Sequence, residues 1–428
     1  MSGPMAGFAS DDRGLVCDDV PVAEIAARVG TPVHIYSAAL IRERYRALDA
    51  AFASRPHRLH YAIKANSTTA VVRELRSLGA RADANSGGEI EVALRAGFTP
   101  DQIVFTGVGK TRAELERAIG LGVAAINAES PGEVDRIAAI AQSLGTVANV
   151  AVRVNPDVAA GAHPHISTGK ATTKFGMSPR DAAGMLRDMA RRPILRIAGL
   201  HVHIGSQITS TEPIVAAVQA IADLAQVAAG EGIRMRHLDV GGGLGIAYEP
   251  GQKVLSVEEY AAAVLGVVRD TDLEVVLEPG RWIVAPAGVL VTQIVDIKNR
   301  DRDSLLEKTS PDPDFFVVVD AGMTDLIRPA FYGAYHGIEP VSRREGAPIR
   351  AEVVGPICET SDTLGQNRLL PPQQVGDLIA VRDTGAYGAV MASNYNRRPI
   401  AAEVMVDNAA WRIVRRRQTV DDMLQWDE

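Results

Sequence analysis

The chain has 428 residues, a formal net charge of −7, and 46% hydrophobic and 23% charged residues. This length suffices for a large barrel and a second domain, and the acidic charge argues against a basic nucleic-acid-binding surface. We therefore interpret the run Arg415-Arg416-Arg417 as a solvated strand or sheet edge. Cys17 and Cys358 are far apart in sequence, so we expect neither a disulfide framework nor a metal site.

The first residues, Met1 to Gly14, lack the basic start and apolar core of a secretory signal. No later stretch reads as apolar for long enough to span a bilayer. We expect a cytoplasmic protein without a membrane partner, and a frayed leading segment.

Residues 20–36 are expected to give one strand to a later β domain, and a helix near 38–53 leads into a barrel. Short β-branched runs then alternate with helix-period segments, the pattern of repeated β-α units. The predicted strands are 58–63, 80–84, 102–106, 123–127, 148–154, 197–204, 236–240 and 274–278. The helical stretches include 111–120, 131–143, 178–191, 213–230 and 256–269. Eight such strands predict an α/β fold with a closed (β/α)₈ TIM-type barrel.

After Trp282 the pattern changes to Val- and Ile-rich segments broken by Gly and Pro, which predicts a mostly antiparallel β-sandwich or barrel domain. Its predicted strands are 289–297, 315–319, 351–357, 377–382, 401–406 and 410–418. The expected domains are a barrel of residues 38–284 and a β domain of residues 15–37 and 285–428.

The connection from Asn155 to about Met177 is unusually long and rich in Gly, His, Ser, Thr and Lys. A lid over an active site and a tolerated surface insertion explain it equally well.

Barrel active sites lie at the carboxyl ends of the strands, and polar residues follow most of the predicted strands here. Lys64 follows an apolar strand, where desolvation favours the neutral, nucleophilic amine needed for a Schiff base. Taken alone, Lys64 is better explained by an ion pair with a neighbouring carboxylate.

The ends of two later predicted strands carry residues suited to binding a phosphate group and a protonated pyridine ring. In Asp239-Val-Gly-Gly-Gly-Leu-Gly245 the glycines let backbone N–H groups approach a phosphate closely, and Ser206 offers a hydroxyl, although a simple tight turn also fits. The spacing matches neither dinucleotide nor nucleoside-triphosphate motifs. Glu278-Pro-Gly-Arg281 is either a bare ion pair or a carboxylate facing a pyridine nitrogen beside an anion-binding guanidinium.

Cys358 lies in Val354-Gly-Pro-Ile-Cys-Glu-Thr-Ser-Asp362. A lone cysteine is usually an inert, small apolar residue, but its polar neighbours favour an exposed turn and a reactive thiol.

Together these residues resemble the alanine-racemase-like, fold-type III decarboxylases that use pyridoxal 5'-phosphate, and within them the diaminopimelate decarboxylase family. The resemblance runs from about Thr31 to Asp407. It is carried by HYAIKAN, HPHISTGKATTKFGM, HVHIGSQ, DVGGGLGIAYEP, EPGRWIVAPAG, DAGMTDLIRPAFYGAYH, VGPICETSD and DTGAYGAVMASNYNRRP.

The resemblance implies a role for each site residue. Lys64 joins the cofactor's aldehyde as a Schiff base, His203 stacks on the ring, and Glu278 meets the pyridinium nitrogen. The other cofactor residues that it implies are Asp83, Ser206, Gly242, Gly243, Pro279, Gly280, Arg281 and Tyr387. The distal carboxylate of the substrate is assigned to Arg281, Arg328 and Tyr332, with Tyr387 nearby, and the distal ammonium to Glu359.

By the same resemblance, the reaction is decarboxylation of meso-2,6-diaminopimelate to L-lysine and carbon dioxide, with Cys358 as proton donor. Cys358 and Glu359 are expected to complete the active site of the partner subunit in a homodimer.

Relatives that act on ornithine, arginine, D-amino acids or carboxynorspermidine share most of the cofactor residues. Arg328 and Glu359 favour a substrate with both a distal carboxylate and a distal ammonium. A non-catalytic regulator on the same fold is disfavoured because Lys64, Glu278 and Cys358 are all present.

Overall fold

A computed structural model describes residues 6–159, 168–170, 172–299 and 315–427. The chain divides into two compact units. The barrel unit comprises Arg44–Ala247 and Lys253–Trp282, and the β unit comprises Met1–Glu43, Tyr248–Gln252 and Ile283–Glu428.

The barrel unit holds a closed barrel of parallel strands in the order β10-β11-β12-β5-β6-β7-β8-β9. The strands are β5 (His57–Ala62), β6 (Arg81–Ala84), β7 (Ile103–Phe105), β8 (Ala125–Ala128), β9 (Ala148–Val154), β10 (Leu195–Val202), β11 (His237–Asp239) and β12 (Glu274–Leu277). β5 pairs with β12 and closes the barrel. The prediction of an eight-stranded barrel is confirmed. Its strands are apolar runs because a barrel with an outer layer of helices buries both faces of its sheet.

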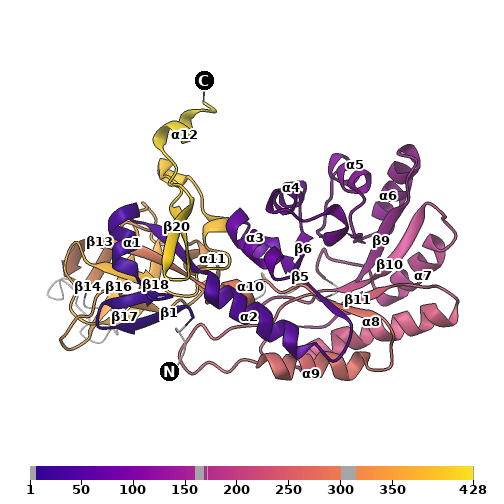
Figure 1. Ribbon diagram of the computed structural model, residues 1–428, viewed down its shortest axis with the longest axis horizontal. Helices are drawn as coiled ribbons and strands as arrows, with labels where there is room; N and C mark the ends of the chain where they lie inside the picture. The colour runs from indigo at the N-terminus through magenta and orange to yellow at the C-terminus, as the bar shows by residue number, and fades with distance from the viewer. Residues whose placement is uncertain (1–5, 160–167, 171, 300–314, 428) are drawn as a thin grey trace. The chain divides into compact units, whose positions relative to one another are not determined.

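Helices connect the barrel strands (Figure 1). They are α3 (Thr69–Ser77), α4 (Gly87–Ala96), α5 (Arg112–Leu121), α6 (Pro131–Ser143), α7 (Pro179–Met189), α8 (Glu212–Gly230) and α9 (Val257–Val268), preceded by α2 (Ala38–Ala51). The hydroxyls of Ser86, Thr111, Ser130, Ser178 and Ser256 each accept a backbone N–H three residues on. These caps satisfy N–H groups that have no partner within the helix, so they fix where each helix begins after its βα loop.

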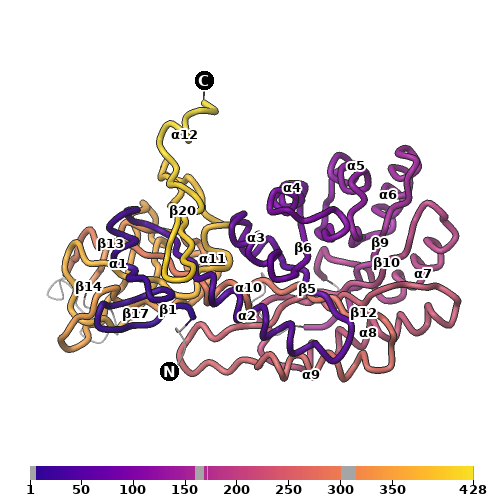
Figure 2. Tube along the Cα trace, in the orientation of Figure 1, coloured from indigo at the N-terminus to yellow at the C-terminus, as the bar shows by residue number. Residues whose placement is uncertain are grey.

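The helix α8 corrects one expectation from the sequence, because its 19 residues are long and apolar enough to cross a membrane by length and composition. α8 connects β10 to β11 along the chain and packs against β10 and α9. Figure 2 follows α8 and α9 along the barrel unit. Its buried face includes Ile214, Val218, Ile221 and Leu224, so packing within the barrel unit explains its apolar character.

The β unit is built on a nine-stranded sheet with the main order β17-β16-β14-β13-β4-β19-β20; β18 pairs with β13 and β15. The strands are β4 (Val33–Ser37), β13 (Gly288–Asn299), β14 (Phe315–Val319), β15 (Ile338–Pro340), β16 (Ile349–Val354), β17 (Thr363–Leu370), β18 (Leu378–Val381), β19 (Ala402–Asp407) and β20 (Ala410–Arg415). Most pairs are antiparallel, as predicted, but β4 with β19 and β14 with β16 are parallel. The predicted contribution of one strand by residues 20–36 is confirmed by β4.

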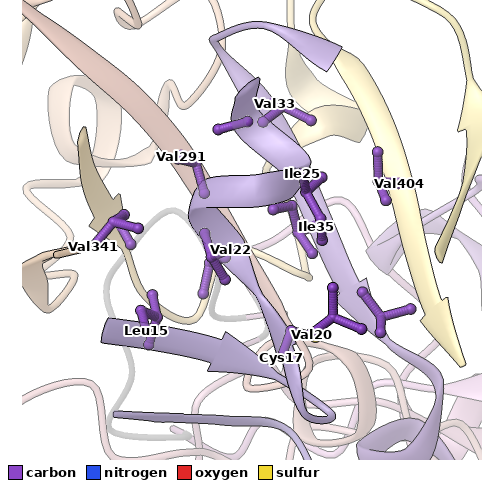
Figure 3. Close-up of a cluster of buried hydrophobic side chains, with 14 of the residues drawn as sticks. Leu15, Cys17, Val20, Val22, Ile25, Val33, Ile35, Val291, Val341 and Val404 are labelled. Atoms are coloured by element: carbon purple, nitrogen blue, oxygen red, sulfur yellow. The ribbon is translucent and has the colours of Figure 1, made fainter. Parts of the chain in front are cut away.

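The expectation of a frayed leading segment is wrong for the described residues before Gly14. β1 (Phe8–Asp11) pairs with β2 (Gly14–Cys17), which pairs with β3 (Val20–Pro21), and α1 (Val22–Val29) follows. Leu15, Cys17, Val22 and Ile25 enter a buried apolar cluster with β4 (Figure 3). Tertiary burial therefore orders strands of only two to four residues, which are too short to be recognised in the sequence.

Two further strands, β15 and β17, were not predicted. In β17 the residues Gln366 and Asn367 are polar and its pairing with β16 has register shifts, so the alternating pattern that marks a strand is interrupted.

Candidate active site

Lys64 lies just past the carboxyl end of β5 and faces a carboxylate on the neighbouring strand. Its Nζ donates to Asp83 Oδ2 at 3.1 Å, and Asn85 Nδ2 donates to the same oxygen at 3.2 Å. Asp83 is fully buried, whereas 32% of the Lys64 side chain is exposed. The ion pair considered from the sequence therefore exists, and it holds an amine that solvent and ligands still reach.

Three buried titratable side chains meet where β10, β11 and β12 end. His201 Nε2 lies 3.3 Å from Glu278 Oε2, and the ligand atoms of His201, Asp239 and Glu278 all lie within 4.8 Å of one another. Glu278 Oε1, Asp239 Oδ2 and His201 Nδ1 are buried without a hydrogen-bond partner in the described part of the chain. This cluster was not identified from the sequence, which singled out Glu278 alone for a role at this point.

The two carboxyl groups of the cluster titrate in opposite directions. Burial, reinforced by the charge of Glu278, raises the pKa of Asp239 well above its usual value. Burial also acts to raise the pKa of Glu278, but His201 and Lys64 outweigh it and the net pKa is lowered. Because two adjacent buried carboxylates repel each other, we assign the negative charge to Glu278 and a proton to Asp239.

His203 follows β10 and is held by the glycine turn after β11. Its Nδ1 accepts the Gly242 N–H at 3.2 Å, which places the proton of the neutral ring on Nε2. Burial, with the nearby charge of Lys64, lowers the pKa of His203 to about 3. The ring is therefore neutral near pH 7 and presents an aromatic face.

The glycine turn is tightly packed against the neighbouring loops. A Cβ on Gly241 would lie 2.4 Å from the Val202 carbonyl oxygen, and one on Gly243 2.5 Å from that of Gly205. In the described residues, the N–H groups of Gly243 and of Gly280 have no protein acceptor. The turn thus needs glycine and still offers backbone donors to an anion.

Arg281 and Ser206 lie together beside this turn. Arg281 Nε donates to Ser206 Oγ at 3.1 Å, and the Arg281 side chain is buried. Pro279 precedes it, and its carbonyl oxygen accepts the Ala62 N–H at 3.0 Å, which ties the loop after β12 to the end of β5. The predicted barrel residues are therefore brought together at one end of the barrel.

The long connection after β9 is described only at its two ends. Asn155 Nδ2 donates to the carbonyl oxygens of Lys170 and Phe175, and Thr168 Oγ1 donates to the His203 carbonyl oxygen at 2.8 Å. Its middle, to which the lid and insertion interpretations refer, lies outside the described residues.

In the β unit, Arg328 begins α11 (Arg328–Tyr332) and is buried. Its Nη1 donates to His336 Nε2 at 2.8 Å, and the Arg328 Cζ lies 4.7 Å from the centroid of the Tyr248 ring. His336 Nδ1 donates in turn to the Arg382 carbonyl oxygen at 2.7 Å. Tyr332 stands four residues after Arg328, on the same helical face.

The turn that carries Cys358 and Glu359 is exposed, and its base is fixed by Asp362. The Asp362 carboxylate accepts the N–H groups of Met323 at 2.5 Å and Ile357 at 2.7 Å. Cys358 Sγ donates to Asn396 Oδ1 at 3.5 Å, and the Tyr395 hydroxyl donates to Glu359 Oε1 at 2.7 Å. Tyr395, Asn396, Tyr248 and His336 lie within the motifs quoted above, but no role for them was predicted from the sequence.

Tyr387 stands in a sharp turn of the same unit, with φ at 57°. A Cβ on Gly385, two residues before it, would lie 1.9 Å from the Val284 carbonyl oxygen. The turn conformation therefore depends on the glycine at this position.

Comparison with known proteins agrees with this geometry. Residues 38–285 match the family model described as "Pyridoxal-dependent decarboxylase, pyridoxal binding domain". The diaminopimelate decarboxylase of Pseudomonas aeruginosa is 44% identical over 98% of this chain and 98% of its own length. That of Neisseria meningitidis serogroup A is 43% identical over 96% of this chain and 98% of its own length. The chain belongs to the pyridoxal-dependent decarboxylases.

A solved structure extends the match to the whole fold. The diaminopimelate decarboxylase of Helicobacter pylori, complexed with L-lysine, superposes with a TM-score of 0.88 at 38% identity and covers 94% of this chain and 98% of its own.

The cofactor of this pyridoxal-dependent decarboxylase is pyridoxal 5'-phosphate, and the barrel residues fit it. Lys64 supplies the reactive amine. Glu278 offers a buried carboxylate oxygen that has no partner in the described residues, which suits a protonated ring nitrogen. Arg281, Ser206 and the backbone of Gly243 and Gly280 suit a phosphate dianion.

Proposed function

We propose that this decarboxylase converts meso-2,6-diaminopimelate to L-lysine and carbon dioxide, the last step of lysine biosynthesis by the diaminopimelate route. The main support is the similarity, over nearly the whole length, to enzymes of that name. The lysine in the Helicobacter pylori complex is the product that such a reaction would leave.

Pyridoxal 5'-phosphate supplies an electron sink that stabilises the electron pair left on the α-carbon when carbon dioxide departs. Lys64 would hold this cofactor through its Nζ. The 3.1 Å contact with Asp83 Oδ2 orients that Nζ.

Glu278 keeps a proton on the ring nitrogen, because its charge is held in a buried setting where electrostatic interactions are strong. Asp239, protonated beside it, leaves Glu278 as the one ionised carboxyl group of the cluster. His203, as a neutral imidazole, is suited to stack on one face of the cofactor ring. Its orientation comes from the Gly242 N–H.

We assign the phosphate group to Ser206, Gly243, Gly280 and Arg281, with Gly242 and Pro279 shaping the two loops. Arg281 is suited to this because its Nε already points to Ser206 and a planar guanidinium binds two oxygens at once. Tyr387 is the residue of the β unit that we expect to reach the cofactor.

The distal end of the substrate carries a carboxylate and an ammonium. We assign the carboxylate to Arg328 and Tyr332, aided by Arg281 and Tyr387, and the ammonium to Glu359. The support for Arg328 is its burial with a fixed orientation between His336 and Tyr248. A substrate without a distal carboxylate would leave this guanidinium unused.

Cys358 delivers a proton to the α-carbon after carbon dioxide has left. We propose that Cys358 and Glu359 serve the active site of the partner subunit in a homodimer, and that the enzyme works in the cytoplasm. Both cysteines are free thiols and Cys358 is exposed, a state that a reducing compartment preserves.

A substrate panel tests the reaction. Carbon dioxide release is measured with meso-diaminopimelate, L-lysine, L-ornithine and L-arginine in the presence of added cofactor. We expect release from meso-diaminopimelate alone at a substantial rate. Faster turnover of ornithine or lysine contradicts the substrate, and cofactor absorbance without release from any amino acid contradicts the enzyme.

Mixing two inactive variants tests the shared site. Lys64→Ala and Cys358→Ala homodimers, dissociated and reassociated together in equal amounts, should recover about a quarter of the wild-type rate. Half of the dimers are then hybrids with one intact site of two. No recovery, with hybrid formation verified by tagged subunits, contradicts the proposal that Cys358 acts across subunits.

A further inference from the structure

A polar cavity lies at the end of the barrel opposite to Lys64, where the strands begin. Its volume is about 230 Å³. Arg58 and His60 line it from β5, Arg81 from the start of β6, His237 from the start of β11, and Arg236 from the position just before β11. Arg236 and Asp101 are exposed, so the cavity opens to solvent on one side, whereas His60 is buried.

The charges around this cavity are unbalanced. It is lined by three guanidinium groups and only two carboxyl groups, those of Asp101 and Glu274. Arg58 Nε donates to Glu274 Oε1 at 2.5 Å, whereas Arg81 Nη1 donates to the backbone oxygen of Asp101 at 3.1 Å. The side chain of Arg236 makes neither a hydrogen bond nor an ion pair with any residue that the structure describes.

His60 is a second, independent sign of a missing partner. His60 lines the cavity, the residue is only 3% exposed, and its two buried ring nitrogens have no hydrogen-bond partner in the described chain. Buried polar groups in folded proteins nearly always have a hydrogen-bond partner. Two ring nitrogens without one in the described residues, in a residue that lines a cavity, therefore indicate a ligand.

The electrostatic environment of the cavity is positive. Burial lowers the pKa of His60 to about 3, with His237 and Arg81 acting in the same direction. Burial and the charge of Arg236 lower the pKa of His237 to about 4. Both imidazoles are therefore neutral near pH 7, and the positive charge around the cavity comes from its three arginines, which exceed its two carboxyl groups. An occupant that balances this charge is an anion.

We propose that this cavity binds a small tetrahedral oxyanion of the phosphate class, between Arg81 and Arg236 and beside the buried ring of His60. The planar fork of an arginine matches phosphate oxygens, and in the described part of the chain neither Arg81 nor Arg236 forms an ion pair with a carboxylate. At roughly 30 Å³ per water molecule, the volume takes one such ion with a few waters but no nucleotide. The site is separate from the cofactor's phosphate and does not depend on the identity of the amino-acid substrate.

The experiment uses the enzyme loaded with pyridoxal 5'-phosphate, so that the cofactor fills the other phosphate site. Binding of radiolabelled inorganic phosphate is measured by equilibrium dialysis at constant ionic strength, while cofactor absorbance verifies that no cofactor is displaced. We expect one bound phosphate per chain. A parallel series with glycerol 3-phosphate distinguishes a free ion from the phosphate group of a larger metabolite, and saturable binding of either supports the site.

Arg236→Gln is the main variant, with Arg81→Gln as a second in case the first folds poorly. Loss of one charge-assisted contact should weaken binding roughly tenfold. Arg234→Gln is the matched control, because Arg234 is exposed on the same segment and makes the same charge change but does not line the cavity. Absence of binding with both ligands, or equal affinity in Arg236→Gln and Arg234→Gln, overturns the proposal.

Discussion

The acid cluster of the barrel and the Cys358 turn of the β unit are organised in opposite ways. His201, Asp239 and Glu278 are buried, and each has an atom with no partner in the described residues. Cys358 and Glu359 are exposed and are oriented by single contacts from Asn396 and Tyr395. Burial makes the cluster's charge strong and fixed, which suits a permanent cofactor, whereas an exposed turn suits groups that must meet a substrate.

The largest expected effect tests the exposed side of this comparison. Cys358→Ala should lower kcat by about 10²–10⁴-fold, the range typical of a lost general acid, because the α-carbon loses its proton donor. The absorbance of the bound cofactor should not change. Stopped-assay carbon dioxide release and visible spectra measure both, and unchanged turnover removes Cys358 from the mechanism.

The buried cluster is tested by a matched pair. Glu278→Gln removes the charge from a side chain of nearly the same shape and should lower kcat by about 10²-fold, as for other lost electrostatic contacts. Asp239→Asn replaces a group that we assign as neutral and should change kcat by only a few-fold. Equal losses in the two variants would show that the charge is shared rather than held by Glu278.

Tyr395→Phe probes the contact that orients Glu359. Removing the hydroxyl should raise KM several-fold and leave kcat nearly unchanged, because a hydrogen bond to a charged group contributes about 1.5–3 kcal/mol at most and this one is partly exposed. Steady-state kinetics separate the two constants. A fall in kcat without a change in KM argues that Tyr395 acts on proton transfer instead.

The smallest effect concerns stability and not turnover. Burial raises the pKa of Asp325 to about 6. The hydrogen bond that its carboxylate accepts from the Gly322 N–H acts to lower this pKa, but burial outweighs it. A raised pKa means that the folded state favours the protonated acid. The stabilising contribution is therefore complete below the unfolded value near 4 and is lost as pH rises through about 6.

Asp325→Asn should therefore become more stable relative to the wild type, by about 1–3 kcal/mol, between pH 4 and pH 7. Urea unfolding across this range measures the difference, with Asp296→Asn as a control at an exposed position of the same unit. A difference that is independent of pH contradicts the assignment.

The sequence predicted the barrel well because its strands are continuous apolar runs and its helices are amphipathic, so each element is recognisable locally. The predicted strand 148–154 coincides with β9. The hairpin of β1 and β2 was missed because its order comes from the distant cluster around β4. Local pattern carries no information about such long-range burial.

The same limit applies to the candidate site. Lys64 and Glu278 stand out because charged residues directly after apolar strands are unusual. Asn396 and Tyr395 contact residues more than 35 positions earlier in the chain, so their spacing gave no signal. His201 lies inside its strand, where an alternating pattern does not distinguish a ring that contacts a carboxylate from one that only fills space.

The strand β4 also has a consequence for biosynthesis. It is buried along its whole length, yet its partners β13 and β19 begin at Gly288 and Ala402. On the ribosome, Val33–Ser37 emerges long before either partner exists, and the barrel residues are translated in between. Any product that stops before Ala402 leaves one edge of this apolar strand open to pairing with other chains, so premature termination should yield aggregates instead of a shortened soluble enzyme.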